Sequence, residues 1–216
     1  MKKLIKIVKY CAIILIITPL VVVGESCRFG SCTPSSEMET DIKPGVYPSY
    51  NDLTKPVGGF EDEYLEKILL RGIVVDKKCI PVPNTKLLLW QKDEYGKRRY
   101  LKRFASEQDR HTMNDHMYSK FVGAGSAVSD SEGRFFFITV DPGSEEKEDN
   151  KSKINISAIG KGFISFETQI KLANEIIDKK KNFISAVFNK SASDHYGQKV
   201  YDFFIVLNGN SRYTKY

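Results

Sequence analysis

The chain has 216 residues, which suffices for one domain and an appendage, and 41% of them are hydrophobic, enough for a core. Its formal charge is +6, but four of the 33 Lys and Arg residues lie within 1–24, which holds no acidic residue. The remainder carries 29 basic and 27 acidic residues and is nearly neutral. We therefore expect no nucleic-acid partner.

The N-terminus has the pattern of an export signal. The basic stretch MKKLIKIVKY precedes an apolar run of 13 residues, CAIILIITPLVVV, whereas a membrane-spanning helix needs about 20 apolar residues. Val22 and Gly24 suit the −3 and −1 positions of a signal peptidase site, so we predict a signal peptide over 1–24. An uncleaved anchor and lipidation at Cys27 are the alternatives, and they offer the only membrane contact that we expect. We predict export to the periplasm or the cell exterior.

Three cysteines follow the predicted cleavage site, namely Cys27, Cys32 and Cys79. An oxidising compartment favours a disulfide, and a Cys27–Cys32 bond would close the small loop CRFGSC. Such a short loop stabilises little. The alternative is three reduced thiols, and the odd number leaves one cysteine over in either case. The pairing stays open at this stage.

Residues 25–62 are predicted to form a flexible arm, and residues 63–216 a single domain. The arm is rich in Ser, Pro, Gly and Thr and offers short hydrophobic anchors at most. Within the domain, residues 91–120 lack apolar periodicity and are expected to make a long polar excursion. The stretch SASDHYGQ, which contains His195, is interpreted as an exposed turn.

From residue 70 onward, short apolar runs alternate with turn signals. LLRGIVVD and TKLLLWQKD flank KKCIPVPN, and the run SAVSDSEGRFFFITVDPG has a turn at its centre. KINISAIGKG, FISFETQIKLA, KNFISAVFN and KVYDFFIVLNG are rich in β-branched and aromatic residues. The spacing predicts an all-β fold, an antiparallel β-sandwich or barrel. Trp90 and most of Phe135-Phe136-Phe137 are assigned to its core, with one ring of the triplet facing outward. KLANEIIDKKK is either a helix or a loop.

The order of these blocks resembles the core of the intradiol ring-cleavage dioxygenases. GIVVDKKCIPVPNTKLLLWQKDEYGKRRY is similar to the opening of that core, with a Pro-Val turn and a strand that ends in Trp-Gln. FVGAGSAVSDSEGRFFFITVDPG resembles the next block, and TQI and VYDFFIVLNG match later landmarks in order. The resemblance spans about residues 65–209. It implies the family's antiparallel β-sandwich.

The resemblance also implies a cofactor, since family members bind Fe(III) through two tyrosines and two histidines and open catechol-type rings with O2. The first tyrosine position falls on Arg98, between Tyr95 and Tyr100. The second falls in SEEKED, which contains no tyrosine. The paired histidines fall on Lys153 and Asn155, neither of which is a histidine.

The family's active-site arginine would lie near Asn150 and is absent as well. Phenolate and imidazole ligands that hold Fe(III) cannot be replaced by neutral amide or hydroxyl oxygens. Candidate substitutes are Tyr100, Tyr95, His111 and His116, which lie within the polar excursion. His111 and His116 are five residues apart, which does not suit two ligands on one helix face.

Two functions follow from this ligand count. The first is a non-catalytic member of the family that binds a protein, an envelope surface or a small ligand and needs no cofactor. The second is a working Fe(III) dioxygenase whose ligands come from Tyr95, Tyr100, His111 and His116. Assembly into a homo-oligomer is left open. Iron content would discriminate between the two hypotheses.

Overall fold

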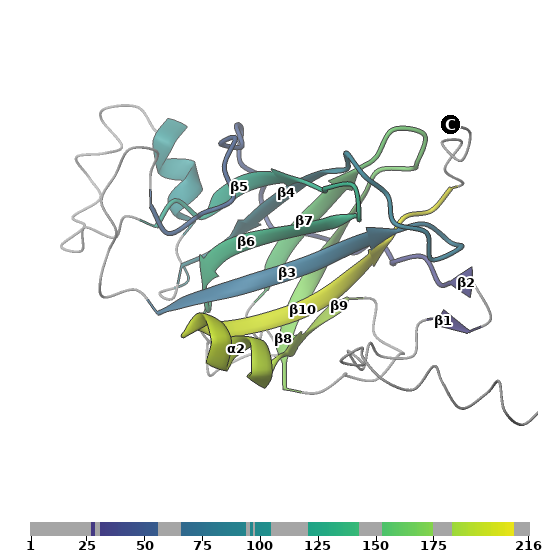
Figure 1. Cartoon of the computed structure of the whole chain (residues 1–216). Coiled ribbons are helices and arrows are strands. Elements are labelled where there is room, and N and C mark those ends of the chain that lie inside the picture. Colours follow the sequence, from purple (N-terminus) through teal and green to yellow (C-terminus); the bar gives the residue numbers. More distant parts are fainter. Residues whose placement is uncertain are drawn as a thin grey trace, which may run out of the picture.

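A computed structural model describes residues 27–28, 31–55, 66–93, 96, 98–104, 121–142, 153–174 and 183–209, apart from the side chains of 27–28 and 102–104. Strands dominate these ranges (Figure 1). A small hairpin near the N-terminus pairs β1 (Cys27–Arg28) with β2 (Ser31–Cys32). The main sheet has eight strands: β3 (Lys67–Val75), β4 (Lys86–Gln91), β5 (Ala124–Val128), β6 (Arg134–Val140), β7 (Ile154–Ile159), β8 (Phe166–Ala173), β9 (Ile184–Phe188) and β10 (Lys199–Val206).

The strand order in the main sheet is β5-β4-β7-β8-β9-β10-β3-β6. Five of the seven pairings between these strands are antiparallel, and two, β8 with β9 and β10 with β3, are parallel. The predicted all-β sandwich is confirmed. The parallel pairings were not predicted, because alternation along a strand sets which side chains face inward but not which strand lies alongside.

The core lies inside the curled sheet and is built from alternate residues of the strands. Phe135 and Phe137 of β6 point into it, whereas Phe136 is 47% exposed, as predicted for the aromatic triplet. The Phe135 ring lies directly against Gly72 of β3, where any Cβ would collide with it. A glycine at this point in β3 therefore makes room for a core aromatic ring.

The two edges of the sheet are joined by a segment of the arm. The N–H groups of Ser126 in β5 and Ile138 in β6 donate to the carbonyls of Tyr50 and Asn51, both at 2.9 Å. The N–H group of Leu53 donates back to Ile138 at 2.8 Å, and the Leu53 side chain is fully buried in the core. Residues 50–53 thus fill the gap between β5 and β6 and nearly close the sheet.

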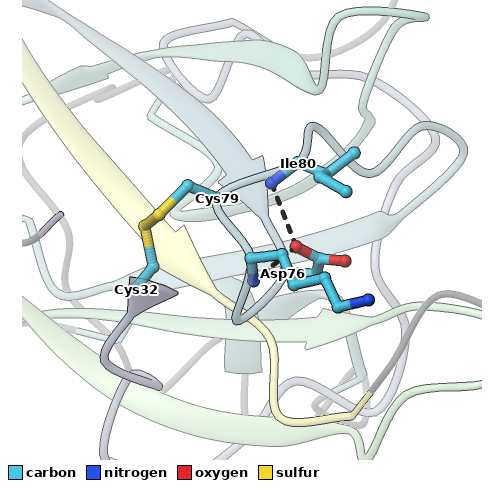
Figure 2. The surroundings of a disulfide bond; sticks show 5 residues. Cys32, Asp76, Cys79 and Ile80 are labelled. Carbon is cyan, nitrogen blue, oxygen red and sulfur yellow. Dashed lines mark hydrogen bonds between the residues drawn. A yellow bond between two sulfur atoms is a disulfide. The ribbon is translucent and has the colours of Figure 1, made fainter. Parts of the chain in front are cut away.

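A disulfide ties the start of the arm to the turn between β3 and β4 (Figure 2). The bond joins Cys32 to Cys79 and therefore does not close the small CRFGSC loop. Asp76 shapes this turn, since its Oδ1 accepts hydrogen bonds from the N–H groups of Lys78 and Ile80. The sequence left the pairing open, and the alternative of a Cys27–Cys32 bond is not the one formed, because folding brings a residue 47 positions away next to Cys32.

Within the described ranges, two short helices accompany the strands: the 3-10 helix η1 (Arg99–Phe104) and α2 (Lys190–Tyr196), which lies beside β10 (Figure 1). Helix α2 corrects the interpretation of SASDHYGQ as a turn. Asn189 caps its N-terminus by accepting from the Ala192 N–H group, and Gly197 ends it with a φ of 67°. His195 lies in its last turn and is exposed, as predicted. No helix within the described ranges is long and apolar enough to span a bilayer.

Replacing Gly125 tests the closure by the arm. An added Cβ there would lie 2.5 Å from the Tyr50 carbonyl oxygen, so Gly125→Ala must push the arm away from β5. We expect a loss of about 2 kcal/mol in the free energy of unfolding, measured by urea denaturation. Gly45→Ala is the matched control, since nothing lies within 4 Å of its added Cβ, and it should change the value by less than about 0.5 kcal/mol. Equal effects of the two substitutions would contradict the close approach.

Removing the disulfide tests the anchor at the other end of the arm. The bond closes a loop of 47 positions, for which the loop-entropy model gives a stabilisation of about 4 kcal/mol. We expect Cys79→Ser to lower the urea midpoint markedly under oxidising conditions. Cys27→Ser, which leaves the Cys32–Cys79 bond intact, is the control. A midpoint for Cys79→Ser that matches this control would show that the bond contributes nothing.

Candidate functional site

The outer face of β4, β7 and β8 presents a row of polar side chains. Trp90, Asn155 and Gln169 are direct register partners across these three strands. Each is 5% exposed or less, although each belongs to the opposite face from its neighbours in the core. Something must therefore cover this face, and the arm does so.

Residues 37–47 of the arm, called the strap below, run across this row. The Gln169 side-chain amide donates from Nε2 to the Glu39 carbonyl at 2.7 Å. Asn155 Oδ1 accepts from the Asp41 N–H group at 3.1 Å, and the Trp90 indole N–H donates to the Asp41 carbonyl at 3.2 Å. Each residue of the row thus holds a main-chain group of the strap.

Two side chains of the strap form ion pairs with other described residues of the chain, Lys43 with Glu167 and Asp41 with Arg98. Arg98 Nη2 donates to Asp41 Oδ1 at 2.6 Å, and Arg98 Nε donates to Oδ2 at 2.9 Å, which is a two-pronged geometry. Burial alone would raise the pKa of Asp41, but the hydrogen bonds from Arg98 and from the Ile42 N–H group outweigh it and lower this pKa below its ordinary value. Asp41 is therefore held as a carboxylate.

An aromatic cluster supports the row from one side. Tyr47 of the strap contacts Trp90 edge to face, with ring centroids 5.8 Å apart, and Tyr100 and Ala124 complete the cluster. Trp90 is fully buried, as predicted, but it lies beneath the strap and not in the main core. The prediction placed Trp90 in the wrong cluster, because a large apolar side chain is equally suited to a position beneath an arm and to the core of a sandwich.

Tyr100 is the one predicted ligand candidate that the structure describes. Its hydroxyl donates to the Ile42 carbonyl of the strap at 2.8 Å, and the side chain is 2% exposed. Burial, with a smaller contribution from the nearby Asp41 carboxylate, raises the pKa of Tyr100 well above its ordinary range. The phenol is thus held in its neutral, hydrogen-bond-donating form. Tyr95, His111 and His116 lie outside the described residues.

The residues at the positions of the family's iron ligands do not fit Fe(III) where the structure describes them. Arg98 is a cation, and Lys153 has an amine side chain. Both ends of the Asn155 amide already have a partner, since Nδ2 donates to the Trp90 carbonyl at 3.1 Å and Oδ1 accepts from the Asp41 N–H group. A ferric ion needs anionic oxygens and imidazoles. Across the described ranges, no group of three or more His, Cys, Asp or Glu side chains is placed to hold a metal. The SEEKED stretch and Asn150 lie outside those ranges.

A cavity of about 560 Å³ opens beside the strap, over β7 and β8. Glu37 and Glu39 of the strap line it on one side, and Ser157 and Glu167 on the other. Lys43 pairs with Glu167 at 2.6 Å and partly neutralises it. Close to this cavity in the fold, Gln169 Oε1 is buried and has no hydrogen-bond partner among the described residues. The fit between the strap and the sheet is therefore not complete.

Sequence reasoning did not find the strap. Asp41 lies in the stretch METDIKPG, which has no motif, and Gln169 appears only as the centre of the TQI landmark. The sole sequence signal was the count that placed Arg98 and Asn155 at ligand positions. The structure brings both residues into contact with Asp41.

Comparison with known proteins agrees with this architecture. The family model Dioxygenase_C, described as "Dioxygenase", matches residues 44–163. A Rickettsia bellii protein named "Putative dioxygenase" is 27% identical over 154 residues, 71% of this chain and 73% of the relative. The "Protocatechuate 3,4-dioxygenase beta chain" of Burkholderia cepacia is 33% identical over 97 residues, 45% of this chain and 38% of its own.

Solved structures show the same fold. The intradiol ring-cleavage dioxygenase of Tetranychus urticae superposes with a TM-score of 0.57 at 16% identity, covering 85% of this chain and 98% of that one. The 3-chlorocatechol 1,2-dioxygenase of Rhodococcus opacus 1CP gives a TM-score of 0.56 at 17% identity, covering 82% and 72%. By fold, by the order of its motifs and by the match of more than half its length, this chain belongs to the intradiol dioxygenase family.

Proposed function

We propose that this protein is an exported member of the intradiol dioxygenase family that has no Fe(III) site and serves as a binding module. One observation supports the proposal: the strap contacts residues at positions that the family resemblance assigns to iron ligands. Asp41 contacts both Arg98 and Asn155, the residues at two of the four ligand positions. The scaffold of a family can outlast its chemistry, because function depends on the site and not on the fold.

The electrostatics of this place support the proposal. A ferric centre would require Arg98 to move away and a phenol to ionise nearby. Arg98 instead pairs with Asp41, and the pKa of Tyr100 is raised by burial, which opposes formation of the phenolate. Tyr100 is therefore poorly suited to act as a substitute ligand while the strap is in place.

Export is supported by the disulfide and by the N-terminal sequence pattern. The Cys32–Cys79 bond is of the kind that persists in the periplasm and outside the cell and is rare in the cytosol. The basic, then apolar residues 1–24 match an export signal. We propose that the binding partner is a protein or another component of the envelope.

Metal content tests the proposal. We expect protein expressed in iron-supplemented medium to contain far less than one iron per chain and to lack the visible phenolate-to-iron charge-transfer band. The double variant Tyr100→Phe/His116→Ala should then have the same trace iron content as the wild type. Near-stoichiometric iron with the visible band would overturn the proposal, and its loss in the double variant would identify relocated ligands.

A further inference from the structure

The face beneath the strap has the chemistry of a site that binds an extended peptide. Most of its contacts are to main-chain groups, which every peptide carries. The Met38 N–H group donates to the Glu167 carbonyl of β8 at 3.0 Å, in addition to the bonds from the row of Trp90, Asn155 and Gln169. Tyr100 adds a bond to the Ile42 carbonyl. Such a pattern gives affinity without demanding a particular sequence.

Selectivity comes from the Asp41–Arg98 pair, which is less exposed than the other charged contact of the strap, between Lys43 and Glu167. Arg98 grips the Asp41 carboxylate with two parallel hydrogen bonds, a geometry that matches a carboxylate and no neutral side chain. The neighbouring side chain of Ile42 faces outward and is 60% exposed, as is that of Val46 at 58%. The site therefore reads an extended backbone and one acidic side chain, and it leaves the next side chain free.

The strap is an occupant that can be replaced. It crosses the face as a linker between two anchors, the Cys32–Cys79 bond and the pairing of residues 50–53 with the sheet edges. Its hold on the face is incomplete, since no donor in the described part of the chain reaches the buried Gln169 Oε1. A linker tethered at both ends is present at a high effective concentration, so tethering can hold a moderate binder in place.

We propose that the face formed by Trp90, Asn155, Gln169 and Arg98 binds an extended segment of a partner protein that places a carboxylate on Arg98, in competition with the strap. This inference deepens the proposed function and rests on it, because a metal centre at the same place would exclude the peptide. The strap acts as a built-in competitor, and the disulfide sets how strongly it competes. Breaking the disulfide lengthens the tether and lowers the effective concentration of the strap.

The test uses the full chain and a labelled synthetic peptide with the sequence of residues 36–46, SEMETDIKPGV, followed by fluorescence anisotropy. We expect the Asp41→Ala chain to bind this peptide at least ten-fold more tightly than the wild type, because its strap has lost the carboxylate. Reduction of the disulfide should tighten binding further in both chains. A peptide with Asn in place of the Asp should bind at least ten-fold more weakly.

Arg98 provides the matched control. Adding Arg98→Ala to Asp41→Ala should abolish the preference for the acidic peptide, and Arg98→Lys should restore it only in part, since Lys keeps the charge but not the fork. Thermal unfolding checks that these variants fold. Two results would overturn the inference: absence of saturable binding to the reduced Asp41→Ala chain, or equal binding of the Asp and Asn peptides. Iron is measured on the same samples to distinguish failure of this inference from failure of the proposed function. Only near-stoichiometric iron would contradict the proposed function.

Discussion

The closure of the sheet by residues 50–53 is the constraint on which the rest of the structure depends. An open eight-stranded sheet would leave β5 and β6 with unpaired main-chain groups at its two edges. Tyr50, Asn51 and Leu53 satisfy both edges at once and bury a leucine in the core. Because this pairing fixes the end of the arm, and the Cys32–Cys79 bond fixes its start, the chain between them has to cross the outer face of β4, β7 and β8.

This crossing explains why the outer face is polar and yet buried. Asn155 and Gln169 would be ordinary surface residues on an uncovered sheet, and buried amides are costly unless they are hydrogen-bonded. The strap supplies main-chain partners for both. The Asp41–Arg98 pair lies at the margin of the same face, where the side chains of Asp41 and Arg98 are 20% and 34% exposed. Partly exposed ion pairs stabilise little, so this pair orients the strap more than it stabilises the fold. This geometry supports the proposal that the face is a recognition surface occupied by the strap.

We propose that family membership and activity separate at this face. The family is evident from the sheet and from the order of the sequence motifs. The residues at the described ligand positions are Arg98, Lys153 and Asn155. Arg98 and Asn155 contact Asp41 of the strap, and the neutral phenol of Tyr100 donates to the Ile42 carbonyl. In the proposed function, these groups bind a peptide backbone, and that function requires no metal. The strap, the Asp41–Arg98 ion pair and the raised pKa of Tyr100 each oppose the binding of Fe(III) at this face.

The sequence by itself determined the family, the all-β fold and the alternation that sends Phe135 and Phe137 inward and Phe136 outward. It also led to the prediction that Arg98 and Asn155 stand at ligand positions of the family, since that inference needs only counting from the matched motifs. The capping residues Asn189 and Gly197 could have indicated helix α2, but the helix is too short to show a helical period in the sequence.

Only the tertiary structure decided which residues meet. The partner of Cys32, the cover over Trp90 and the role of Asp41 all depend on contacts between positions that are far apart in the chain, such as Asp41 and Asn155 at a separation of 114. Local sequence carries propensity and periodicity, which set strands and faces. It carries no record of where an irregular arm will lie, because such an arm has no periodicity of its own and takes its path from the surface that it covers.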